Sequence, residues 1–128
     1  MSKIVLDASA LLAVLNAEPG MDRLTPELLN DATSSTVTLA EVQSKLVKRG
    51  VGPEDAWLAA LSPIREATAF TAEQARIAGD LVTQTSPFGL SLGDRACLAL
   101  GIALQAPVYT AHRLWKNLKL GIRIHVVR

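Results

Sequence analysis

The segment Lys3-Ile4-Val5-Leu6-Asp7 gives the strongest indication of the fold. It is a short apolar run that ends in an acid, and residues 8–16 continue it with better helix formers. This pattern is typical of a buried strand that leads straight into a helix. The same alternation recurs along the chain, so we expect an α/β fold with a mostly parallel sheet covered on both faces. Ligand sites in such sheets lie beyond the carboxyl ends of the strands.

Two sets of segments carry this expectation. Apolar or β-branched runs predict strands at residues 3–7, 33–37, 64–70, 108–111 and 122–127. Helical periodicity and helix-start signals predict helices at residues 8–16, 22–30, 39–49, 53–61, 71–83 and 91–104. The last of these helices is apolar nearly all round and is expected to be buried.

Composition places the chain among ordinary globular proteins. With 128 residues, 49% apolar and 20% charged, residues 1–128 are expected to form a single domain. One cysteine, Cys97, excludes an internal disulfide and a thiolate zinc cluster and favours a cytoplasmic setting. We expect neither export nor a membrane span, because Asp7 interrupts the first apolar run and Pro107 breaks the longest uncharged one.

Charge is distributed unevenly along the chain. Residues 1–94 contain 12 acidic and 7 basic residues, whereas residues 95–128 contain 6 basic residues and no acidic one. The two parts therefore carry net charges of −5 and +6. Basic side chains are usually solvated surface, but beside an acidic cluster they can also hold the backbone of a polyanion.

Three acids stand where the expected strands and loops pass into helices. Asp7 closes the first strand, and Glu41 and Asp94 are expected in the first turns of their helices. Each has a structural explanation, because Asp7 can cap a helix and the pairs Thr38-x-x-Glu41 and Ser91-x-x-Asp94 have capping-box spacing. If the acids converge instead, their like charges favour a hard divalent cation, magnesium or manganese rather than zinc.

Four segments together resemble the PIN-domain nucleases, and more narrowly the short VapC-type toxins of bacterial toxin–antitoxin pairs. They are residues 4–11 (IVLDASAL), 38–42 (TLAEV), 92–99 (LGDRACLA) and 108–115 (VYTAHRLW). The resemblance implies a three-layer α/β/α sandwich with a mostly parallel sheet of about five strands. It also implies cleavage of RNA phosphodiester bonds, inhibition by a cognate antitoxin protein, and homodimers.

The family's site residues carry over by position. Asp7, Glu41 and Asp94 match its first three acids, so the resemblance implies that they are the catalytic residues and hold Mg²⁺ or Mn²⁺. Asp7 and Asp94 would bind the ion directly or through water, and Glu41 would bind it or orient the attacking water. Ser9 matches the small hydroxyl residue two positions after the first acid, and we group it with the expected RNA contacts.

His112 departs from the family pattern, which usually has an aspartate at that position. A neutral imidazole can bind manganese, but it brings no negative charge and is a poorer partner for magnesium. The other interpretation is a loop residue with no ligand role. This departure leaves open whether a second metal binds and whether activity is reduced.

Basic residues around the expected pocket are candidates for RNA binding. Arg95 adjoins Asp94, Arg113 adjoins His112, and Lys116 follows within one turn. Surface solvation explains each of them equally well.

Two functions therefore stay open. One is a metal-dependent endoribonuclease toxin, and the other is a catalytically weakened PIN domain that binds RNA or an antitoxin without efficient turnover. A phosphotransfer receiver domain also sets acids at strand ends, but the pair of adjacent acids it needs after the first strand is absent from this sequence.

Overall fold

Five short strands form the centre of the computed structural model, which describes residues 2–128. The strands are β1 (Ile4–Leu6), β2 (Ala32–Ser35), β3 (Glu66–Thr68), β4 (Val108–Thr110) and β5 (Ile124–Val126). They are ordered β3-β2-β1-β4-β5, and every neighbouring pair is parallel. The predicted parallel sheet of about five strands is confirmed.

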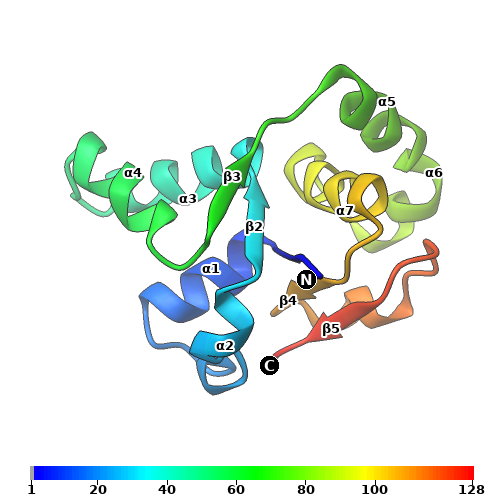
Figure 1. Cartoon of the computed structure of the whole chain (residues 1–128). Coiled ribbons are helices and arrows are strands. Elements are labelled where there is room, and N and C mark those ends of the chain that lie inside the picture. Colours follow the sequence, from blue (N-terminus) through cyan, green and yellow to red (C-terminus); the bar gives the residue numbers. More distant parts are fainter. Residues whose placement is uncertain (1) are drawn as a thin grey trace.

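Helices connect the strands and cover both faces of the sheet (Figure 1). The α-helices are α1 (Ala8–Leu15), α2 (Pro26–Leu29), α3 (Thr36–Lys48), α4 (Pro53–Leu61), α5 (Ala72–Asp80), α6 (Val82–Thr85) and α7 (Leu92–Leu104). Short 3-10 helices are η1 (Met21–Arg23), η2 (Ser86–Phe88) and η3 (Arg113–Asn117). Among residues 2–128, no helix is both long enough and apolar enough to cross a membrane.

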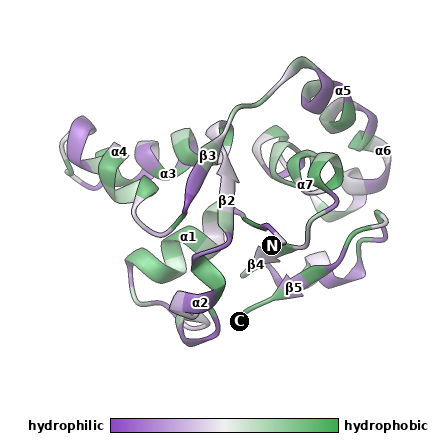
Figure 2. Ribbon diagram, in the orientation of Figure 1, coloured by the Kyte–Doolittle hydropathy of each residue, from purple (hydrophilic) through white to green (hydrophobic). Residues whose placement is uncertain are grey.

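Alternating side chains of β1 divide the core between the two faces of the sheet. Ile4 and Leu6 belong to a cluster with residues of α1, α3 and α4, whereas Val5 belongs to a second cluster with residues of α7 and η3. All three side chains are buried, and the burial of each stabilises the folded state by about 1.5–3 kcal/mol. Figure 2 shows α1 and α7 largely in apolar green and the edge strand β3 partly in hydrophilic purple.

The order of the strands reverses beside β1. The chain moves outward from β1 through β2 to β3, then returns through α7 to β4 on the other side of β1 and ends at β5. In open parallel sheets, a crevice forms at the carboxyl ends of the two strands where this reversal occurs. Here these ends are Leu6 of β1, paired beside Tyr109 of β4.

Three expected boundaries were wrong. The strand over 33–37 ends at Ser35, which caps α3, so this helix begins at Thr36 rather than Leu39. The single helix over 22–30 is two elements, because Pro26 opens α2 with Thr25 as its N-cap. The helix over 71–83 ends at Asp80 and is followed by α6; Gly79, with its low helix propensity, stands beside this end.

Candidate active site

Asp7 lies where β1 passes into α1, and it is only 2% exposed. Its Oδ1 accepts hydrogen bonds from the Ala10 backbone N–H at 2.8 Å and from the Ser9 hydroxyl at 2.7 Å. Its Oδ2 accepts one from the Thr110 hydroxyl at 2.6 Å, from the end of β4. The capping role expected of Asp7 is therefore real, but the bond from Thr110 also ties this carboxylate to the crevice between β1 and β4.

Burial raises the pKa of Asp7, and this effect outweighs its three hydrogen bonds and the nearby His112, which all lower the pKa. A buried carboxylate is costly when it is charged, because desolvation disfavours the ionised form. A residue that served only as a helix cap could sit at the surface without this cost. Asp7 therefore combines its capping role with a buried carboxylate at the end of β1.

Asp94 stands in the first turn of α7 and forms the predicted capping box with Ser91. The backbone N–H of Ser91 donates to Asp94 Oδ2 at 3.0 Å, and the backbone N–H of Asp94 donates to Ser91 Oγ at 3.2 Å. This carboxylate is partly exposed. The capping box fixes its position at the start of the helix.

Glu41 is not a helix cap. Because α3 begins at Thr36 with Ser35 as its N-cap, Glu41 lies in the second turn, and the capping box expected with Thr38 does not exist. Its carboxylate packs against Gly93 of α7 so closely that a Cβ atom at Gly93 would overlap it. The capping explanation of Glu41 was therefore wrong.

The carboxylate of Glu41 lies within range of the charges of the other two acids. Burial raises the pKa of Glu41, and the negative charges of Asp94 and Asp7 raise it further, while Lys45 opposes them. Cys97 lies one turn along α7 from Asp94. Burial raises the pKa of its thiol, and the negative charges of the three carboxylates raise it further. Three acids from separate parts of the chain thus share one electrostatic environment.

His112 stands at the rim of this group. Its backbone N–H donates to Thr110 Oγ1 at 3.0 Å, and its Nε2 lies 3.9 Å from Asp7 Oδ2. The ring is tilted against Trp115, with centroids 5.4 Å apart, and the side chain is 54% exposed. The imidazole therefore faces the buried carboxylate from the solvent side.

The donor set suits a hard cation, although the site is not assembled as a metal cluster. Among residues 2–128, no three His, Cys, Asp or Glu side chains lie close enough to hold a metal ion as they stand. The acids offer only oxygen ligands, which magnesium and manganese prefer. After burial, the negative charges of Asp94 and Asp7 also raise the pKa of Glu41, and a bound cation would neutralise these charges.

The expected RNA contacts have different surroundings. Arg113 and Lys116 are exposed on η3, and Arg113 lines a cavity together with Asp94 and His112. Arg95 points toward α5, where its guanidinium donates to the Ala78 carbonyl at 2.8 Å. Ser9 is held inside the site, since its hydroxyl donates to Asp7 and accepts from the Ala111 backbone N–H.

Thr110 is the site residue that the sequence analysis missed. Its hydroxyl contacts Asp7, Ser9 and the backbone of His112. The signal was its place at the end of a predicted strand, but that signal becomes useful only once β4 is known to be the neighbour of β1.

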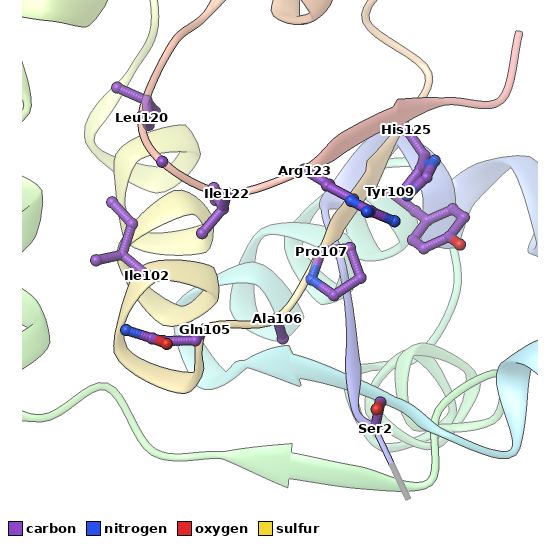
Figure 3. Close-up of a pocket in the computed structure, with 11 residues that line it drawn as sticks. Ser2, Ile102, Gln105, Ala106, Pro107, Tyr109, Leu120, Ile122, Arg123 and His125 are labelled. Atoms are coloured by element: carbon purple, nitrogen blue, oxygen red, sulfur yellow. The ribbon is translucent and has the colours of Figure 1, made fainter.

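Two cavities lie near opposite ends of β4. One, of about 240 Å³, is lined by Asp94 and His112 together with residues of η3 and of the loop before α7. A larger one, of about 770 Å³, lies beside Pro107 at the amino end of β4 and is shown in Figure 3. Its wall includes the stacked rings of Tyr109 and His125, but none of the three acids. The smaller cavity is therefore the one that adjoins the candidate active site, at Asp94 and His112.

Solved structures of VapBC proteins are similar to the chain. It matches VapBC2 from Rickettsia felis bound to a promoter DNA fragment, with 22% identity, 98% of both chains covered and a TM-score of 0.75. DNA-bound VapBC from Salmonella typhimurium matches with 18% identity, all of both chains covered and a TM-score of 0.77. Mycobacterium tuberculosis VapC20, described as a sarcin-ricin loop cleaving toxin, matches with 20% identity, 94% and 99% covered and a TM-score of 0.72. The TM-scores show that the chain shares its fold with these structures.

Comparison of the sequence with curated proteins and with family models gave different results. No curated protein matches the chain significantly. The family model of the PIN domain matches residues 4–118, which span β1 to the end of η3 and include all three acids and His112. Because this match covers most of the sequence, the chain belongs to the PIN domain family.

Proposed function

We propose that the chain is a metal-dependent endoribonuclease, the toxin of a VapBC-type toxin–antitoxin pair. The observation that carries this proposal is the position of Glu41. Its carboxylate caps no helix, packs against Gly93 and experiences the charges of both Asp94 and Asp7. Three carboxylates that repel one another have a use when a cation joins them, and cation-assisted attack on a phosphodiester is a reaction such a group supports.

Each residue of the site has a proposed role that follows from its surroundings. A bound Mg²⁺ or Mn²⁺ supplies activation of water and neutralisation of phosphate charge. Asp7 and Asp94 would hold the ion, because hydrogen bonds fix both carboxylates in place. Glu41 would bind the ion as well or orient the attacking water, because its carboxylate caps no helix and packs against Gly93, next to Asp94. Arg113 and Lys116 would hold the RNA backbone.

Features outside the site support the partners implied by this proposal. An apolar groove of about 690 Å³ beside α1 and α2 is lined by Val14, Leu29 and the 42% exposed Met21. Protein partners cover exposed apolar surface of this kind, and we propose a cognate antitoxin and a second copy of the chain as such partners. One similar structure is described as a sarcin-ricin loop cleaving toxin, which supports an RNA substrate.

Cleavage assays with two isosteric variants test the proposed activity. Purified protein incubated with structured RNAs and Mg²⁺ or Mn²⁺ should cleave them, and EDTA should abolish cleavage. Asp7→Asn and Glu41→Gln should each lower the rate on the order of a hundredfold or more. Asp80→Asn, an exposed acid at the end of α5, is the matched control and should cleave like the wild type. Equal cleavage by Asp7→Asn would point to a contaminating nuclease.

His112 favours a second candidate function, a PIN domain that binds RNA or an antitoxin without efficient turnover. An imidazole at the rim adds no fixed negative charge where the family usually has an aspartate. Tight binding of RNA with no product in either metal would support this alternative. It would also exclude the nuclease.

A further inference from the structure

The cavity of about 240 Å³ beside the acids has walls of two kinds. Asp94 and His112 form the side that faces the candidate active site. The other walls come from the loop around Gly89 and from η3, and they are mainly apolar: Phe88, Leu90, Leu114 and Trp115. Arg113 adds a cation to this lining.

Leu114 is the most exposed large apolar residue described in the structure, at 62%, whereas its neighbour Trp115 is 3% exposed. The core therefore uses Trp115 and leaves the leucine in solvent at the mouth of the cavity. A single exposed leucine is ordinary. Leu114, however, lines a cavity that also contains Asp94 and His112, so it offers an apolar contact to a group that binds there.

The size and chemistry of the cavity indicate its occupant. Drug-sized ligands fill pockets of about 300–1,000 Å³, so this cavity suits a smaller flat group. The apolar side chains of Phe88, Leu90 and Leu114 can contact the face of a nucleobase, so a base unstacked from single-stranded RNA gains apolar contact there. The guanidinium of Arg113 suits the phosphate next to that base.

We propose that this cavity is a base-binding subsite, which takes one unstacked nucleobase beside the scissile phosphate of single-stranded RNA. The inference rests on the proposed function, because Asp94 belongs both to the cavity wall and to the cluster that would act on the phosphate. The subsite would make cleavage depend on a base flanking the cut, in a segment free of base pairing.

Binding of short RNAs to a non-cleaving protein tests the subsite. The Asp7→Asn variant keeps a residue that caps helices well, so it serves as the background. Labelled hexamers of A, C or U and an abasic ribose-phosphate hexamer of equal charge are titrated with it by fluorescence anisotropy. At least one base-bearing hexamer should bind about fivefold or more tightly than the abasic one.

Two leucine variants test whether the preference for base-bearing RNA comes from this cavity. In the Asp7→Asn background, Leu114→Ala should remove the preference for base-bearing RNA, and Leu104→Ala, an exposed leucine at the other end of α7, should keep it. Both are truncations of exposed side chains, and their thermal transitions check that the fold is intact. The proposal is overturned by equal binding of abasic and base-bearing hexamers, by no binding of either, or by a preference that survives Leu114→Ala.

These outcomes separate the subsite from the proposed nuclease activity. If the cavity accepts a side chain of a partner protein instead, the hexamers bind equally and the subsite proposal fails while cleavage by the wild type continues. If the wild type cleaves no RNA, the binding preference of the Asp7→Asn protein still supports the subsite.

Discussion

Asp7 combines a stabilising role with a destabilising charge. It caps α1, yet burial raises its pKa, so the folded state holds its proton more tightly than the unfolded state does. Without metal, its contribution to stability is therefore present at low pH and is lost as pH rises from about 4, the ordinary aspartate value, through the raised pKa of the folded state. Above this range, the burial of Asp7 lowers the stability of the folded state.

We therefore expect Asp7→Asn to stabilise the metal-free protein at pH 7. Asparagine caps helices about as well as aspartate and carries no charge, so the melting temperature should rise by about 3 °C for each 1 kcal/mol gained. The gain should shrink below about pH 4, where Asp7 is protonated in both states. Calorimetry with chelator at pH 4 and pH 7 measures both effects. A lower melting temperature at pH 7 would show that the carboxylate stabilises the fold.

His112 is predicted to set the metal preference of the site. Its Nε2 lies 3.9 Å from Asp7 Oδ2, so a residue at this position can act on an ion held by Asp7. Imidazole suits manganese better than magnesium, whereas a carboxylate suits both. His112→Asp should therefore raise the affinity for Mg²⁺ on the order of tenfold, and His112→Ala should weaken Mn²⁺ binding. Isothermal titration of each ion checks this, and unchanged affinities would mean that the position contributes nothing.

Helices α3 and α7 pack closely where Gly93 meets the Glu41 carboxylate. A Cβ atom at Gly93 would overlap the Glu41 carboxylate, which is the flexible end of its side chain and can move away. Gly93→Ala should therefore keep the fold, with equal or slightly higher stability because alanine favours helix. It should lower cleavage on the order of a hundredfold, since a displaced catalytic group is costly.

Gly79→Ala is the matched control for this substitution. Gly79 also lies in a helix, α5, but a Cβ atom there meets nothing within 4 Å. It should gain the same helix propensity and leave the cleavage rate unchanged. Cleavage rates and melting temperatures of the two variants separate the effects. If Gly93→Ala cleaves like the wild type, the contact with Glu41 has no part in catalysis.

How far the sequence predicted these elements depends on the range of the interactions involved. The capping box of Ser91 and Asp94 is local, so its spacing was enough to find it. The start of α3 was placed three residues late, because Ser, Thr and Val favour strands and Ser35 acts as a cap only in its observed conformation. The approach of Glu41 to α7 joins residues about 50 positions apart in sequence, and no pattern within one segment shows it.

The uneven distribution of charge along the chain predicts how RNA binding depends on salt. The excess of acids lies before residue 95, and residues 95–128 contain six basic residues and no acid. Arg113 lines the cavity beside Asp94, and Lys116 is exposed on the same short helix, η3. An RNA that reaches the acids therefore passes these cations. Each contact between a cation and a phosphate of a single strand releases counterions and adds about 0.7 to the slope of log affinity against log salt.

Arg113→Gln and Lys116→Gln should each reduce this slope by about 0.7 in the Asp7→Asn background, and their combination should reduce it by about 1.4. The control, Arg76→Gln, removes an exposed arginine from α5 and should leave the slope unchanged. Anisotropy titrations of a 20-nucleotide RNA between 50 and 300 mM KCl provide the slopes. If all three single variants lose the same amount, RNA responds to the net charge of the protein, and the position of the cations beside the acids carries no function.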